Sequence, residues 1–112
     1  MLTEELNIYK DALNLAKQLY KYINDVPKHL RYSEYSTIIK NILNIIDYIF
    51  LANSNKDKRR SILYKCQALA YSIKFRLRLF GELKYLKQNQ VTYLMFLLKK
   101  VQKQIVGWKN HS

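Results

Sequence analysis

Cationic and aromatic side chains recur at helical spacing between residues 57 and 87, where together they could bind a polyanion. Neighbouring members of this row are three, four or seven positions apart, so on a helix they share one side. Lysine and arginine form charge-assisted hydrogen bonds with phosphate oxygens, and a tyrosine ring can stack on an unpaired base. We call this row the basic stripe: Arg60, Tyr64, Gln67, Tyr71, Lys74, Arg78 and Tyr85.

Further cations lie beside the basic stripe. Arg76 borders it, near Lys65 and Ser72. A second cluster lies at the start of the same segment and consists of Lys56, Lys58, Arg59 and Arg60. Positive charges at a helix N-terminus oppose the helix dipole, so this cluster does not stabilise the helix. The candidate phosphate-binding residues from this pattern are Arg60, Lys74, Arg76, Arg78, Lys56, Lys58 and Arg59, with Tyr64 and Tyr71 as candidates for stacking.

A solvated surface is the alternative interpretation of both the stripe and the cluster. Glu82 lies four residues after Arg78 and could hold it in an exposed ion pair. Such a pair contributes only about 0.3–0.5 kcal/mol. The stripe therefore predicts a binding face, with a solvated face as its alternative.

The charge of the chain is large and unevenly placed. The net charge is +12, but residues 1–25 carry three lysines against four acids, so the excess lies in residues 26–112. Such an excess favours a polyanionic partner, with nucleic acid as the first candidate. An AT-rich coding sequence and the solubilising effect of lysine would also explain it.

Residues that could carry catalysis are few. The two histidines, His29 and His111, and the single cysteine have no metal-ligand spacing, and neither GxxxxGK[ST] nor GxGxxG occurs. Cys66 falls on an apolar row, where we expect an inert core thiol. The sequence predicts no catalytic residue, no metal and no cofactor, and we expect a protein that is not an enzyme.

Apolar periodicity and short polar breaks predict an all-α protein with four helices. Two glycines and one proline argue against a sheet-rich fold. The first helix runs from Thr3, as its cap, to about Asn24, and Pro27 ends it. The second starts near Ser33, the third covers about 57 to 87, and the fourth is capped by Asn89 and stops at Gly107. An up-down four-helix bundle in a single domain, residues 1–112, is the expected architecture.

The apolar positions predict which faces form the core. The first helix has two apolar rows, Leu6, Tyr9, Leu13, Ala16, Tyr20 and Ile23, and Ile8, Ala12, Leu15 and Leu19. The predicted row of the third is Ile62, Cys66, Leu69, Ile73, Leu77, Phe80 and Leu83. The second helix is apolar over most of its circumference, which one small bundle buries with difficulty, so we expect a homo-oligomer.

The sequence also bears on location. The longest apolar run, residues 42–52, is interrupted by Asp47 and is shorter than the roughly 18–20 residues that a membrane span needs. The N-terminus lacks the positive region of a secretory signal, and the lone cysteine forms no internal disulfide. A cytoplasmic protein is the expected result.

Four segments, in order, resemble the Avd-like four-helix bundles, the accessory variability determinants of diversity-generating retroelements. PKHLRYS (27–33) is similar to a segment after the first helix of that family, and LANSNKDKRRSIL (51–63) to the junction between helices two and three. RLRLFGELKYL (76–86) resembles an arginine-leucine region, with Arg78 and Leu79 at the matching pair. VGWKN (106–110) resembles the C-terminal segment, where Lys109 follows the tryptophan and Gly107 and Trp108 are structural.

The resemblance implies an assembly and a role. Its members form ring-shaped homopentamers, bind a reverse transcriptase and nucleic acid, and support mutagenic copying of a template RNA without an active site of their own. It adds Lys109 to the candidate nucleic-acid-binding residues and is consistent with Arg78, Lys56 and Lys58. RNA, DNA and a hybrid of the two remain open as ligands.

Other classes of protein stay possible at this point. A related branch, encoded in intervening sequences of large-subunit ribosomal RNA genes, shares the bundle. A structural or protein-interaction bundle without a specific nucleic-acid role would need only the core. A membrane-surface protein is a further alternative, because basic amphipathic helices also bind anionic lipid. A small enzyme with an unrecognised site is the least favoured.

Overall fold

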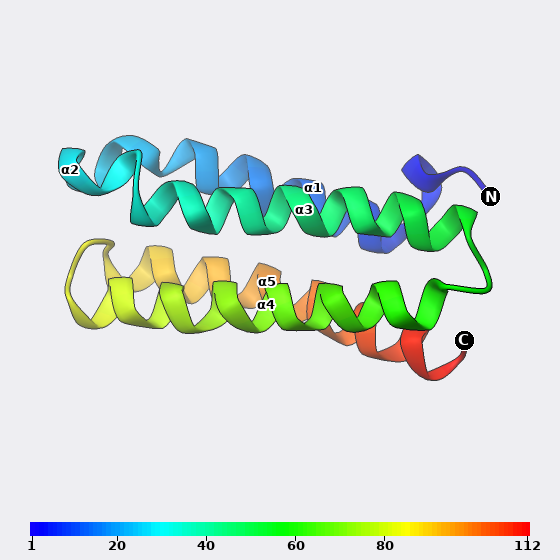
Figure 1. Cartoon of the computed structure of the whole chain (residues 1–112). Coiled ribbons are helices and arrows are strands. Elements are labelled where there is room, and N and C mark those ends of the chain that lie inside the picture. Colours follow the sequence, from blue (N-terminus) through cyan, green and yellow to red (C-terminus); the bar gives the residue numbers. More distant parts are fainter.

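Helices make up the whole fold. A computed structural model describes residues 1–112, and it contains no strand. Four long helices run alternately up and down along one axis (Figure 1). The helical segments, in chain order, are η1 (Thr3–Glu5), α1 (Asn7–Lys21), η2 (Ile23–Asp25), α2 (Lys28–Arg31), α3 (Glu34–Ser54), α4 (Arg59–Glu82) and α5 (Gln88–Asn110).

The long helices form a closed bundle around one core. α1 packs on α3, α3 on α4, α4 on α5, and α5 on α1, in a body of 42 × 20 × 20 Å. Both termini lie at the same end as the α3–α4 connection, and α2 lies at the other end with the α4–α5 turn (Figure 1). The prediction of a four-helix, all-α bundle is confirmed. No helix is long and apolar enough to cross a membrane.

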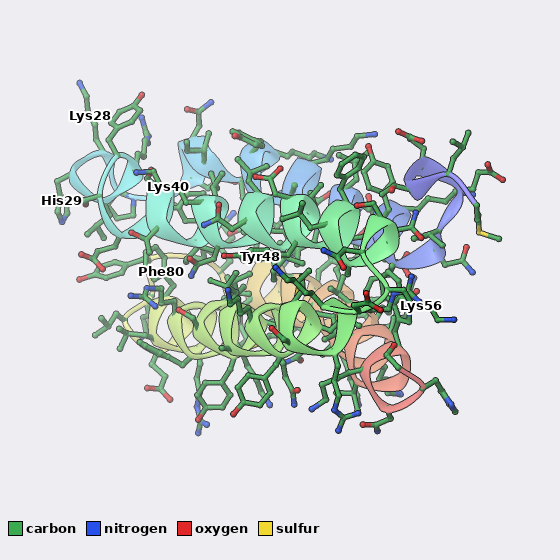
Figure 2. The ribbon with its side chains drawn as sticks, turned by 45° about the vertical axis from the view of Figure 1, so that its right-hand side comes forward. Lys28, His29, Lys40, Tyr48, Lys56 and Phe80 are labelled. Atoms are coloured by element: carbon green, nitrogen blue, oxygen red, sulfur yellow. The ribbon has the colours of Figure 1, made fainter.

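Apolar side chains of all four helices fill the core. The isoleucines Ile38, Ile42, Ile45 and Ile49 of α3 are fully buried, so this segment is a helix in spite of its β-branched composition. Burial of a large apolar side chain contributes about 1.5–3 kcal/mol, which outweighs the small helix propensity penalty of isoleucine. Phe80 lies between α3 and α4 (Figure 2) and contacts Tyr35, with ring centroids 5.9 Å apart.

The predicted core row of α4 was partly wrong. Cys66, Ile73, Leu77 and Phe80 are buried as expected, but Ile62 and Leu69 are only half-buried and Leu83 is exposed. Leu63 and Ala70 are buried in their place. The reason is that α4 packs on two neighbours, α3 and α5, so the centre of its buried face lies between two apolar rows.

The start of the first helix also differs from the prediction. Thr3 does not cap a long helix: it is buried in the short segment η1, and its hydroxyl oxygen accepts a hydrogen bond from Asn53 Nδ2 at 3.1 Å. Leu6 is extended, and α1 begins at Asn7. Of the two apolar rows, the second is buried throughout, because Ile8, Ala12, Leu15 and Leu19 face the core, whereas Ala16 is the one buried member of the first row.

Pro27 separates α1 from α3 as predicted, but the break is itself partly helical. α1 ends at Lys21, three residues before the predicted end at Asn24. η2 lies at that predicted helix end, and α2 occupies residues expected to be irregular. Arg31 holds the bend, since its Nε and Nη2 donate to the carbonyl oxygens of Val26 and Asn24 at 3.0 and 2.9 Å. α3 then begins at Glu34, next to the predicted start at Ser33.

The turn between α4 and α5 replaces the predicted end of the third helix. α4 ends at Glu82, and Lys84 has a φ of 61°. Tyr85 therefore leaves the basic stripe and packs edge-on against Phe80, with centroids 5.5 Å apart. Asn89 is not the cap of α5. The cap is Lys87, whose N–H donates to Gln90 Oε1 at 3.0 Å, so α5 begins at Gln88, two residues earlier than a cap at Asn89 would place it.

The end of α5 was also predicted wrongly. Gly107 lies inside the helix, which continues to Asn110. A glycine costs only about 1 kcal/mol in a helix interior, so the packing of the next residues can override it. Trp108 is half-buried and packs against the core, as expected for a structural residue.

Candidate nucleic-acid interface

A cationic groove runs along the outer surface between α4 and α5. Two surface hollows of about 480 and 500 Å³ open there, and Lys74 lines both of them. Arg78 lies in the first hollow with Thr92 and Met95 of α5. The second is lined by cations of α5 as well. We call this surface the basic groove, and its cations are Lys74, Arg78, Lys99 and Lys103.

Acidic side chains do little to neutralise the basic groove. Glu82 is the one acid that lines its two hollows, and it accepts a hydrogen bond from Arg78 Nε at 3.3 Å. Both partners are mostly exposed, so the pair contributes little. The α1–α5 side differs, because there Lys100 lies 3.9 Å from Asp11. An excess of positive charge therefore remains between α4 and α5.

α5 contributes two exposed cations that the sequence pattern did not single out. Lys99 and Lys103 are four residues apart and exposed, so helical spacing alone places them on one side. Which neighbour that side faces depends on how α5 packs, and α5 has two neighbours, α1 and α4. The signal was therefore present in the spacing, but the packing was needed to join these lysines to Lys74 and Arg78.

At the end of the bundle that carries both termini, side chains of α4 and α5 interlock. Arg60 Nη1 donates to the carbonyl oxygen of Lys109 at 2.9 Å. Lys109 Nζ donates to Gln67 Oε1 at 2.9 Å and lies 5.4 Å from the ring centroid of Tyr64. A surface hollow of about 660 Å³ opens beside them, lined by Asp57, Arg60, Ser61, Tyr64, Lys65 and Lys109.

The two tyrosines of the basic stripe remain available. Tyr64 and Tyr71 are 66% and 68% exposed, and a third hollow of about 240 Å³ lies between them. Figure 2 shows aromatic rings and nitrogen-bearing side chains projecting from α4 on the side away from α3. The structure thus brings Arg60, Lys74, Arg78, Lys109, Tyr64 and Tyr71 onto the surface of α4 and α5 that faces outward.

Arg59 serves the fold rather than this surface. Its Nε donates to the carbonyl oxygen of Ala52 at 2.8 Å and its Nη2 to that of Asn53 at 3.3 Å. These carbonyls belong to the last turn of α3, which lacks partners of its own. The guanidinium also lies 5.3 Å from the ring centroid of Trp108. Arg59 therefore ties together α3, α4 and α5.

Arg76, Lys56 and Lys58 lie away from the basic groove. Arg76 donates to Ser72 Oγ, which also accepts from Asn41 Nδ2 of α3 at 3.1 Å, so Arg76 lies on the α3 side of α4. Lys56 and Lys58 belong to the α3–α4 connection. Figure 2 shows Lys56 at the end opposite to Lys28 and His29.

Two further reactive groups, Cys66 and Tyr35, lie in the core. Cys66 is fully buried, with its Sγ 4.0 Å from the carbonyl oxygen of Ile45, and burial raises the pKa of this thiol to about 12. Burial likewise raises the pKa of Tyr35, whose hydroxyl donates to the carbonyl oxygen of Leu19 at 2.5 Å. His, Cys, Asp and Glu side chains form no group of three that could hold a metal ion.

The fold and this surface define a small helical bundle with one cationic, partly aromatic side. The chain belongs to the bAvd-like family, whose family model matches residues 6–112. The resemblance to Avd-like bundles in the four sequence segments is thereby confirmed. No curated protein matches the chain.

Proposed function

We propose that this protein is a non-enzymatic accessory protein of a diversity-generating retroelement. It binds the reverse transcriptase and nucleic acid, and it supports mutagenic copying of template RNA in the cytoplasm. Membership of the bAvd-like family supports the class of protein. The observation that carries the proposal is the basic groove, in which cations of α4 and α5 meet with Glu82 as the one acid.

The basic stripe, to which the groove residues Lys74 and Arg78 belong, suits a polyphosphate chain better than a single small anion. Arg60 and Arg78 are 18 residues apart on α4, which corresponds to about 27 Å along the helix. A nucleic-acid strand carries one phosphate per roughly 3.4 Å, so several phosphates can lie along this length. Each contact is weak and easily screened by salt, and affinity comes from their number.

Assembly into a ring, most simply a homopentamer, would repeat this surface around an axis. Exposed apolar side chains on α3 support an assembly, since Leu43, Phe50 and Leu51 are 37%, 57% and 46% exposed. Burying them against another copy would remove apolar area from water. Copies joined in one ring present several basic grooves to one nucleic-acid chain, which raises the effective concentration of binding sites.

Co-expression with the reverse transcriptase of the same element tests the proposal. We expect the two proteins to purify together, the accessory protein to have the mass of a homopentamer by light scattering, and complementary DNA synthesis to depend on it. Replacing the four groove cations by glutamine should greatly reduce synthesis. The matched control replaces four exposed lysines of α1 and α3, Lys10, Lys17, Lys21 and Lys40.

Each part of this experiment can contradict the proposal. Failure of the reverse transcriptase to co-purify, with synthesis unchanged by the accessory protein, would rule out the retroelement role. A monomeric mass would rule out the ring. Equal loss of synthesis in the groove variant and in the control would show that net charge matters and the basic groove does not.

A further inference from the structure

A hollow on α4 separates two exposed tyrosine side chains. Tyr64 and Tyr71 are seven residues apart, two helical turns, which places them about 10 Å apart along the axis. Between them the hollow of about 240 Å³ is lined by Gln67 and Ala68. Ala68 is exposed and short, so nothing from its own position fills the space. We call this hollow the tyrosine slot.

Tyr64 stands between two hollows, and the cation nearest its ring lines only one of them. Lys109, 5.4 Å from the ring centroid, lines the larger hollow at the end of the bundle and not the tyrosine slot. Tyr64 lines both hollows. The cation therefore does not occupy the slot, and the side of Tyr64 toward Tyr71 stays free for a second partner.

Gln67 gives the tyrosine slot a polar edge that can donate a hydrogen bond. Its Oε1 accepts the hydrogen bond from Lys109 Nζ at 2.9 Å. The amide nitrogen is therefore the group left to interact with a ligand in the slot, and it is a donor. Nucleobases present carbonyl oxygens and ring nitrogens along their edges, and these accept hydrogen bonds.

We infer that the tyrosine slot binds unpaired bases, so that the ligand of this surface is a single-stranded nucleic acid. The inference rests on the nucleic-acid binding proposed above and names its class. About 10 Å corresponds to three intervals of roughly 3.4 Å, the rise of stacked bases, which leaves room for one or two bases between the rings. The bases of a duplex are already stacked on each other and do not enter such a slot. The phosphates of the same strand would lie along Lys74 and Arg78.

Filling the slot tests this inference without removing a charge. The variant Ala68→Leu places a larger side chain between the tyrosines, and leucine is a good helix former, so the fold is kept. Asn14→Leu is the matched control, since it adds a leucine at an exposed position of α1, away from the apolar face of α3. A second variant, Tyr64→Leu with Tyr71→Leu, removes the rings. The probes are a short oligothymidylate, an abasic strand of the same length, and a duplex, measured by fluorescence anisotropy.

The expected result separates base stacking from phosphate contact. Ala68→Leu and the double tyrosine variant should bind oligothymidylate about tenfold more weakly and the abasic strand as tightly as the wild type does. The control should bind all probes like the wild type. The slot is disproved if Ala68→Leu binds oligothymidylate normally, or loses affinity equally for the abasic strand. If the wild type binds none of the probes, nucleic-acid binding itself is disproved, and the slot with it.

Discussion

At the scale of single residues, burial makes two ionisable side chains unreactive at neutral pH. Cys66 and Tyr35 are both fully buried, and in each case burial raises the pKa of the side chain. A thiol or phenol in this setting stays protonated at neutral pH and does not act as a nucleophile. These groups therefore matter for stability and not for binding.

Cys66 gives the protein a pH dependence of stability in the alkaline range. Its pKa is about 12 in the folded chain and 9.0 when unperturbed. The folded thiol stays protonated where the unfolded thiol ionises, so its contribution is complete below about pH 9 and is lost as the pH rises toward 12. Between about pH 8 and about pH 10, the free energy of unfolding of the wild type should fall by about 1 kcal/mol more than that of Cys66→Ala.

Urea unfolding of both proteins at several pH values measures this difference. Subtracting Cys66→Ala removes the contribution of the tyrosines, which ionise in both proteins. An equal fall in the two proteins would contradict the buried position of the thiol.

Arg59 and Arg60 show that residue type alone does not predict which groups a cation contacts. Arg59 and Arg60 are adjacent in the sequence, and both were candidates for phosphate binding. Arg59 donates to carbonyl oxygens at the end of α3, whereas Arg60 lines an open hollow on α4. One residue corresponds to about 100° around a helix, so adjacent positions face different neighbours. The sequence predicts the charge, but the partner depends on the packing.

At the scale of helices, apolar periodicity predicted the number and order of the long helices correctly. The residue types at the predicted helix ends did not predict where the helices begin and end. The number and order of the long helices follow from apolar spacing and from Pro27, whose ring excludes helix before it. Thr3, Asn89 and Gly107 each have the residue type of a helix end, yet none of them caps or ends a long helix. Caps contribute only about 1 kcal/mol, so tertiary contacts such as that of Thr3 with Asn53 override them.

The two glycines give a prediction about the helices that contain them. Gly107 lies inside α5, and a Cβ there would meet nothing within 4 Å, so Gly107→Ala should raise the free energy of unfolding by about 0.5–1 kcal/mol. At Gly81 in α4, a Cβ would lie 3.2 Å from Val91 Cγ2. The free energy of unfolding of Gly81→Ala should therefore rise by at least about 0.5 kcal/mol less than that of Gly107→Ala, because the contact between α4 and α5 must adjust to the added methyl group.

Thermal or urea unfolding of the two variants beside the wild type provides the comparison. A destabilised Gly107→Ala would show that Gly107 ends the helix after all. Equal gains in the two variants would show that α4 and α5 are not closely packed at Val91.

At the scale of the whole molecule, the distribution of charge connects the fold to the proposed function. The first 25 residues carry three lysines against four acids, a net charge of −1, so residues 26–112 carry an excess of +13. The bundle then brings α4 and α5 side by side, and their exposed cations meet in the basic groove. The sequence predicted the stripe on α4, but only the packing of α5 shows that Lys99 and Lys103 extend it.

The most direct measurement is the salt dependence of binding to single-stranded RNA. Anisotropy titrations at several salt concentrations would compare the wild type, a groove variant and a control variant. The groove variant replaces Lys74, Arg78, Lys99 and Lys103 by glutamine, and the control replaces Lys10, Lys17, Lys21 and Lys40. Each lowers the net charge by four, so only the position of the lost charges differs.

The basic groove predicts a steep loss of affinity with salt in the wild type and in the control. In the groove variant the slope of log K against log salt should be shallower by about 0.7 for each phosphate contact removed. Equal slopes in the groove variant and the control would contradict the central claim, since binding would then follow net charge and not the groove between α4 and α5.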